Sequence, residues 1–407
     1  MSGIPRAATL DSTAELLREG YAFIPSRCRR YGCDAFETRL LLAPAVCLQG
    51  AEAARVFYGQ QLTRRGALPL AVLGLLQDKG SVAGLDGQAH RARKDLFLSI
   101  VEPAQRRRLL GIAAQEWQLA IERWRRADHV VLLDAVEEVL CRAVCAWSGV
   151  PLGEPEAYER TRELGAMIEG TGSLGPRNAR GHLMRRRTER WAAAVIGGIR
   201  AGSLTPPQEC AAAAIARYRA PGGQQLSSED AAVELINVLR PTVAVARFIV
   251  FEALAVHQHG PPPAGGEEPF AQEVRRFYPF FPAVAGKVTG EFEWRGYRFP
   301  AGRRVLLDLY GTNHDPRSWA DPGQFRPERF AGWDGDPYSF IPQGGGEHAR
   351  HHRCPGEWPT IELMEQALQV LTRDITYTVP RQDLSVPLGR IPAQPVSRFV
   401  IRDVRRR

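Results

Sequence analysis

Apolar residues recur at helical spacing along most of this 407-residue chain. The pattern is clear from Ala104 to Arg126, where arginines separate the apolar positions, and again from Val131 to Trp147. A Ser-Ser-Glu-Asp capping sequence predicts a long helix from Ser227 to about Gln258. Gly260 and the prolines that follow predict a loop as far as Pro269, and a further helix is expected over Gln272 to Tyr278.

Strand-like alternation is confined to one short region. Phe292 to Phe299 alternates between apolar and polar residues, and the apolar run from Arg304 to Leu309 follows it. No internal repeat and no linker-like stretch interrupts the chain. The pattern therefore predicts a mainly α fold with small β-sheets, organised as a single domain over residues 1–407.

Composition and charge narrow the class of protein. Hydrophobic residues make up 44% and charged residues 24% of the chain, which is typical of a soluble globular protein. The net charge is +8, but basic residues are interleaved with acidic and apolar ones, so nucleic-acid binding is not favoured. No apolar stretch is long enough to span a membrane, and the first residues lack a signal-peptide pattern. The seven cysteines are scattered and odd in number, which predicts reduced thiols, and we expect a cytoplasmic protein.

The most informative segment contains Cys354 among glycines, histidines and arginines, directly before a helical pattern. Backbone N–H groups and the helix dipole favour an anion at that position, and Arg350 and Arg353 are expected to lower the pKa of the thiol further. A thiolate held in this way suits axial ligation of haem iron.

Two alternatives to haem ligation stay open for this cysteine. It could be an inert buried thiol, or one ligand of a zinc site. Zinc ligation is a real alternative because two of the neighbouring histidines have the spacing of a zinc pair. The candidate partners are His348, His351, His352 and Glu347.

Two other segments favour haem. Glu273 and Arg276 lie three residues apart, on one face of a helix. Downstream, the sequence Phe325-Arg-Pro-Glu-Arg-Phe330 supplies Arg329, which could complete a Glu–Arg–Arg network. With these segments in this order before the cysteine loop, nearly the whole chain resembles the cytochrome P-450 superfamily of haem-thiolate enzymes. The resemblance implies the mainly helical cytochrome P-450 fold, haem b with Cys354 as the proximal iron ligand, and a structural role for the network.

The chain departs from the usual superfamily pattern at the oxygen-activating helix. Arg240 and Pro241 occupy the places of the acid and the alcohol that support dioxygen cleavage. An arginine in an apolar helix is costly unless an anion neutralises it, so we expect Arg240 to bind a substrate carboxylate in the distal pocket. That carboxylate would replace the missing acid–base group when hydrogen peroxide is the oxidant. The alternative is a solvent-facing Arg240 beside a tolerated proline kink.

These features resemble the bacterial fatty-acid peroxygenases within the superfamily. Matching phrases include Glu19 to Pro25, Leu239 to Pro241 and Ile341 to Gly346, although Phe340 and Cys354 lie fourteen residues apart, farther than is usual. The resemblance implies catalytic roles for Arg240 and Pro241. It also implies that the haem propionates are bound by Arg64, His90, Lys94 and Gln343. The substrate is expected to contact Arg240, Leu76, Gln77, Ala83 and Ile168.

Three positions differ from this group as well. Ala83 stands where members carry Gln, or His in those noted for decarboxylation, and alanine cannot form a side-chain hydrogen bond. Gln77 replaces a typical phenylalanine, and His351 replaces a typical glycine. These differences concern the products and not the reaction class.

The sequence thus predicts a peroxygenase that hydroxylates long- or medium-chain fatty acids at the alpha or beta carbon with hydrogen peroxide and no dedicated redox partner. Decarboxylation to terminal alkenes, reductase-dependent monooxygenation, and a non-catalytic haem or zinc protein are the alternatives.

Overall fold

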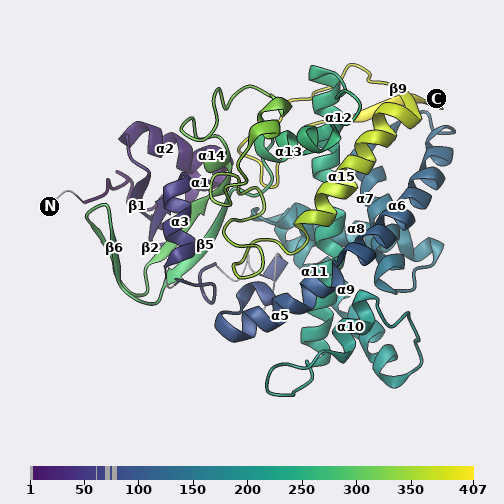
Figure 1. Ribbon diagram of the computed structural model, residues 1–407, viewed down its shortest axis with the longest axis horizontal. Coiled ribbons are helices and arrows are strands. Elements are labelled where there is room, and N and C mark those ends of the chain that lie inside the picture. Colours follow the sequence, from purple (N-terminus) through teal and green to yellow (C-terminus); the bar gives the residue numbers. More distant parts are fainter. Residues whose placement is uncertain (1–2, 61, 69–73, 76–79) are drawn as a thin grey trace.

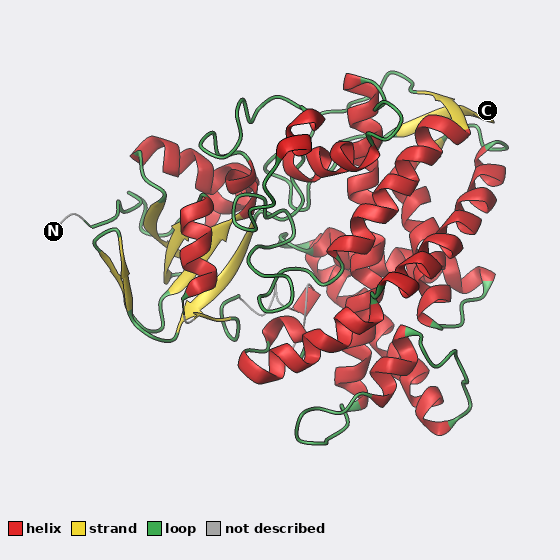
Figure 2. Ribbon diagram, viewed as in Figure 1, coloured by secondary structure: helices red, strands yellow, loops and turns green. Residues whose placement is uncertain are grey.

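The computed structural model describes residues 1–407 except 1–2, 61, 69–73 and 76–79. Helices make up most of it, and a small sheet lies at the N-terminal side (Figures 1 and 2). The α-helices are α1 (Thr13–Glu19), α2 (Phe23–Tyr31), α3 (Ala51–Gly59), α5 (Gly87–Ile100), α6 (Pro103–Trp124), α7 (Leu132–Ser148), α8 (Glu154–Gly170), α9 (Pro176–Ala201), α10 (Ala211–Arg217), α11 (Ser228–Ala244), α12 (Ala246–His259), α13 (Glu267–Phe277), α14 (Leu309–Asn313) and α15 (Glu357–Gln369). Shorter helical turns are η1 (Gly20–Ala22), η2 (Val82–Gly84), η3 (Pro327–Gly332) and η4 (Val370–Asp374).

Within the described residues, the strands form three small sheets. The five-stranded sheet has the order β1 (Ala35–Leu40), β2 (Ala43–Leu48), β8 (Arg304–Asp308), β5 (Ala283–Val288) and β3 (Leu62–Thr63). Within it, β2 and β8 are parallel and the other pairs are antiparallel. A second sheet joins β4 (Val130–Val131), β10 (Val400–Arg406) and β9 (Ile375–Thr378), and β6 (Phe292–Trp294) pairs with β7 (Tyr297–Phe299). The larger sheet thus joins segments from both ends of the chain.

Helix α11 runs through the middle of the helical region and positions the candidate site. It packs against α7, α8 and α9, and nearly all of its residues between Ala231 and Ala244 are buried. An apolar surface on every side is what a helix inside a large core requires. The Ser227 hydroxyl caps it by accepting a hydrogen bond from the Asp230 N–H over 2.9 Å, as the capping sequence predicts.

The structure corrects three expectations about the elements. The long helix predicted from Ser227 to Gln258 is two helices, because the helical hydrogen-bond pattern is interrupted at Val245. Helix α13 begins at Glu267, inside the predicted loop, because two first-turn glutamates favour a helix N-terminus and a proline is tolerated there. Strands β1, β2 and β5 were not predicted. The β1–β2 hairpin turns at Leu41 and Leu42, without the glycine or asparagine that signals such a turn, and β2 also pairs with β8 more than 250 residues away.

Candidate active site

Cys354 lies in the loop immediately before α15. Its backbone N–H donates to the Gln343 carbonyl over 3.1 Å, and its own carbonyl contacts His348 Nε2 at 3.0 Å. The loop turns sharply at Gly344 and Gly346, whose φ angles are 90° and 78°. Only glycine adopts that backbone conformation without a steric cost, so the glycines set the path that places the thiol.

Burial is the largest influence on the Cys354 thiol and raises its pKa. The influences that lower the pKa are a hydrogen bond from the Gly356 N–H and the positive charges of Lys94 and Arg275. The expectation that Arg350 and Arg353 supply these charges is wrong. Arg350 is exposed and forms an ion pair with Glu347, and Arg353 is paired with Glu357.

An ion-pair network centred on Glu357 also supports the cysteine loop, and it was not predicted from the sequence. Glu357, the first residue of α15, accepts from Arg275 Nη2 over 2.5 Å and from Arg353 Nε over 2.6 Å. Arg275 also donates to the Gln343 side chain over 3.0 Å and lies over the Phe340 ring, 5.2 Å from its centroid. The available signal was the first arginine of Glu273-Val-Arg-Arg276, which is Arg275.

Glu273, Arg276 and Arg329 come together as a buried network. The Arg276 guanidinium donates two hydrogen bonds to the Glu273 carboxylate, both over 2.7 Å, and neither side chain is exposed. Arg329 Nε donates to the same carboxylate over 3.3 Å. Arg276 also reaches the carbonyls of Asn313 and Pro322, so the network fixes the segment that leads into the cysteine loop.

A cluster of basic groups packs against the cysteine loop. Its members are Arg64, His90, Lys94 and His352. The His90 and His352 rings stack with centroids 3.8 Å apart. Lys94 is almost fully buried, and its ammonium group donates to the backbone carbonyls of His351 and Arg353. Burial lowers the pKa of Lys94 to about 8, and burial with the charges of Lys94 and Arg64 lowers that of His90 to about 4.

This basic cluster has too little negative charge to balance it. Arg64 is held by the Ala285 carbonyl over 2.5 Å, and its backbone N–H donates to Asp86. Among the carboxylates that act on these groups, Asp86 lies 3.9 Å from His352, Glu357 is already paired with Arg275 and Arg353, and Asp95 is exposed. Buried cations require anionic partners, so the cluster fits the two propionates of haem b, beside a cysteine able to bind the iron. Gln343 points elsewhere, toward Arg275 and Thr360, so its propionate contact stays a prediction.

The zinc alternative finds no support in the geometry. Among the residues that the structure describes, no group of histidine, cysteine and carboxylate side chains is arranged to hold a metal ion. His351 Nδ1 instead accepts from the Glu347 backbone N–H over 2.7 Å, and His352 stacks on His90.

Arg240 lies on the buried side of α11, and 7% of its surface is exposed. Burial, followed by the charge of Arg185, lowers the pKa of Arg240 to about 9, whereas the negative charge of Cys354 raises it. The guanidinium therefore lies within electrostatic range of the thiol. The expectation of a solvent-facing arginine is excluded, and Pro241 is accommodated inside α11, which continues to Ala244.

Two of the remaining predicted substrate contacts lie on elements that contact α11. Ala83 lies in η2, which is fixed to α11 because the Val82 N–H donates to Glu234 over 2.8 Å. Ile168 is buried on α8, which packs against α11. Leu76 and Gln77 lie outside the described residues.

Comparison with known proteins decides the family. The cytochrome P-450 family model matches residues 269–359, which include most of α13 and the cysteine loop. The solved structure of cytochrome P450SP alpha (CYP152B1) in complex with (R)-ibuprofen is 48% identical in sequence, with a TM-score of 0.95. That match covers 97% of this chain and 99% of the other. The chain belongs to the cytochrome P-450 family.

Two further P-450 structures agree along their full lengths. Cytochrome P450EX alpha (CYP152N1), solved with myristic acid, is 40% identical with a TM-score of 0.96 and complete coverage of both chains. Ligand-free cytochrome P-450 OleT is 33% identical with a TM-score of 0.96, covering 99% of each chain. This P-450 therefore belongs with the CYP152 proteins, and the predictions of a mainly helical P-450 fold, haem b and a fatty-acid-oxidising enzyme class are confirmed.

Curated plant P-450s match over a shorter segment. Tabersonine 6,7-epoxidase isoform 1 from Catharanthus roseus is 36% identical over 113 residues, which is 27% of this chain and 22% of the relative. Beta-amyrin 6-beta-monooxygenase from Solanum lycopersicum is 28% identical over 136 residues, 31% of this chain and 28% of the relative. The matched segments thus span only about a quarter of these relatives. None of the described helices combines the length and apolarity needed to cross a bilayer.

Proposed function

We propose that this P-450 uses hydrogen peroxide to hydroxylate fatty acids at the alpha or beta carbon, and that Arg240 binds the substrate carboxylate. The observation that carries this proposal is a guanidinium buried on α11 within electrostatic range of Cys354. The related structures with myristic acid and with ibuprofen support it, since both ligands are carboxylic acids.

The energetics of Arg240 favour an acidic ligand. Burial lowers the pKa of this arginine to about 9, so the guanidinium is still charged at neutral pH but is poorly solvated. A carboxylate can accept two parallel hydrogen bonds from such a group and restore the lost electrostatic stabilisation. An alcohol or a methyl ester of the same length offers no matching charge.

Haem b, bound through the Cys354 sulfur and held by Arg64, His90 and Lys94, would supply the oxidising chemistry. Arg240 and Pro241 stand where an acid and an alcohol would otherwise deliver protons, and neither can act as an acid–base group near neutral pH. The carboxylate that Arg240 holds can instead take a proton from one oxygen of hydrogen peroxide and return it to the other. This is why we expect turnover with peroxide alone and no dedicated redox partner.

The position of the carboxylate sets which carbon reacts. With the acid group fixed at Arg240, only the first carbons of the chain are held near the reacting centre. Ala83 has no polar side-chain atom, so it cannot direct a proton during loss of carbon dioxide. We therefore expect hydroxylated acids as the main products, with terminal alkenes minor.

The test is a fatty-acid panel incubated with the holoenzyme and hydrogen peroxide, with products identified by mass spectrometry. Alpha- or beta-hydroxy acids formed without a reductase support the proposal. Turnover that requires ferredoxin and NADPH would overturn it, and a predominance of alkenes would overturn the assignment of hydroxylation.

A further inference from the structure

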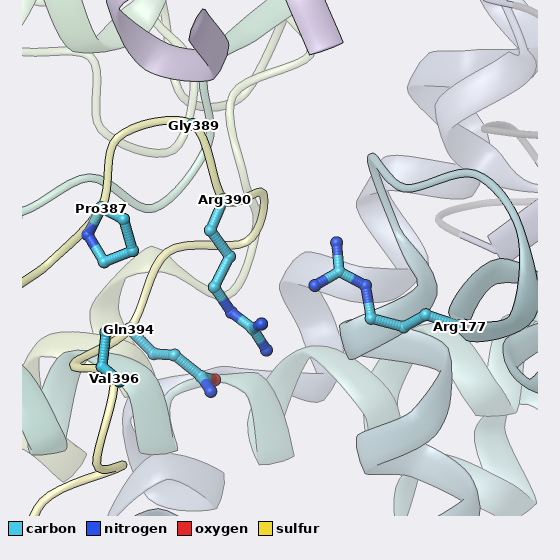
Figure 3. Close-up of a pocket in the computed structure, with 6 residues that line it drawn as sticks. All are labelled: Arg177, Pro387, Gly389, Arg390, Gln394 and Val396. Carbon is cyan, nitrogen blue, oxygen red and sulfur yellow. The ribbon is translucent and has the colours of Figure 1, made fainter. Parts of the chain in front are cut away.

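A cavity of about 440 Å³ is built from residues to which the proposed function gives no role. It lies between the start of α9 and the segment 387–396 (Figure 3). Its volume is within the range of about 300–1,000 Å³ that is typical of small-molecule pockets. The lining residues are Arg177, Pro387, Gly389, Arg390, Gln394 and Val396.

Two arginines approach this cavity from opposite walls. Arg177 is near the start of α9 and Arg390 is in the facing loop, and their guanidinium groups point toward one another (Figure 3). Arg177 donates to the Ile391 carbonyl over 3.0 Å, a neutral partner. Two like charges that converge on one space repel each other unless an anion lies between them.

The acidic groups nearby are already shared among other arginines. Arg390 Nη2 donates to Glu169 over 2.5 Å, and the fully buried Arg247 binds the other oxygen of the same carboxylate. Arg247 also contacts Glu137 at 3.3 Å. Arg390 and Arg247 therefore share Glu169, and Glu137 pairs with Arg247. With its amide group in the flipped orientation, Gln394 adds neutral hydrogen bonds to Glu169 and Arg390.

Positive charge is consequently in excess at the cavity. The pKa of Arg177 is lowered by burial and then by the charges of Arg390 and Arg247, against which Glu169 acts in the opposite direction. Burial raises the pKa of Glu137 to about 7, so its negative charge is incomplete near neutral pH. The first turn of α9 contains no acidic residue, and its N-terminal N–H groups add to the attraction for an anion.

We propose that this cavity is a second carboxylate subsite, in which Arg177 and Arg390 bind the head group of a fatty acid. Pro387 and Val396 give the cavity apolar walls, which suit an amphiphilic anion better than inorganic phosphate. The cavity also adjoins α8, the helix that carries the predicted substrate contact Ile168. The next residue of that helix, Glu169, binds Arg390 in the cavity wall. The identity of the ligand rests on the proposed function, because it is the substrate itself.

The test measures how many fatty-acid molecules bind to each protein molecule. Radiolabelled myristate is measured by equilibrium dialysis against the holoenzyme at low ionic strength. The wild type should bind two molecules. In the double variant Arg177→Gln/Arg390→Gln, the myristate at Arg240 should bind with its original affinity, and the affinity of the cavity should fall at least tenfold. In Arg240→Gln, the myristate at Arg240 should be lost and the one in the cavity should remain. Arg180→Gln, which removes an exposed charge one turn along α9, is the matched control and should bind two.

Several outcomes would overturn the subsite. These are a single bound myristate in the wild type, or two of unchanged affinity in the double variant. Displacement by inorganic phosphate at lower concentration than by acetate would reject a carboxylate as the ligand, and equal binding of methyl myristate would reject a charged head group. Because Arg177→Lys keeps the charge, it should keep the second molecule even if the double variant proves unstable. Failure of the proposed function would appear separately, as absence of hydroxylated product with two myristates bound.

Discussion

Replacing Arg240 by glutamine should separate substrate binding from stability. The lowering of the pKa of this arginine to about 9 corresponds to a penalty of about 5 kcal/mol on the charged guanidinium, at 1.36 kcal/mol per pKa unit. A bound carboxylate offsets part of that penalty in the complex. Removing one partner of a buried charge pair typically costs about 2–5 kcal/mol of binding.

We therefore expect kcat/KM for a fatty acid with peroxide to fall about 10²–10³-fold in Arg240→Gln, equivalent to about 2.7–4.1 kcal/mol. The unliganded holoenzyme of the variant should stay folded and show a cooperative thermal transition, because glutamine retains hydrogen-bonding groups at this buried position. The fatty alcohol of the same length, which has no carboxylate, should react equally slowly with both proteins.

Peroxide-driven turnover measured by mass spectrometry, together with thermal denaturation, checks this prediction. Arg186→Gln is the matched control, since it makes the same change of charge at an exposed position of α9 and should leave both quantities unaltered. A kcat/KM within threefold of wild type would refute the role of Arg240 in binding the carboxylate. A lower melting temperature with an equal loss for acid and alcohol would instead make it a structural residue.

Three further predictions concern pH, the buried network and the basic cluster. Arg240 binds a carboxylate only when protonated, so kcat/KM for fatty acids should be retained below about pH 9 and decline as pH rises through that value, whereas a neutral substrate should show no such decline in a pH–rate profile. Glu273→Gln should leave the charge of Arg276 uncompensated and destabilise the protein by about 3–5 kcal/mol, seen as a lower denaturation midpoint; an unchanged midpoint would contradict the network's structural role. Lys94→Met should speed transfer of haem to apomyoglobin without altering the thiolate-type absorption spectrum from Cys354, and an unchanged transfer rate would argue against propionate binding by Lys94.

Several chemical features of the site could be predicted from residues that are close together in the sequence. The spacing of Glu273 and Arg276 already places both on one helix face, and Arg329, which the sequence also indicated, donates to the same carboxylate. The glycines before Cys354 similarly favour a tight turn, because glycine adopts positive φ angles without the steric cost that other residues meet. Such features depend on neighbours a few residues apart, which is why they can be read without coordinates.

Charges acting between distant segments could not be read in this way. Arg350 and Arg353 are close to Cys354 in sequence but face their own glutamates, whereas Lys94 and Arg275 act on the thiol across the fold. Strands β2 and β8 pair although more than 250 residues separate them.

The sequence by itself therefore determined the residue types of the site, the helical architecture and the cysteine loop. Only the tertiary structure decided that Arg240 is buried near that loop, and that Arg177 and Arg390 converge on one cavity. The physical reason is that burial and electrostatic attraction depend on distance in space, and only the packing of helices far apart in the chain sets that distance.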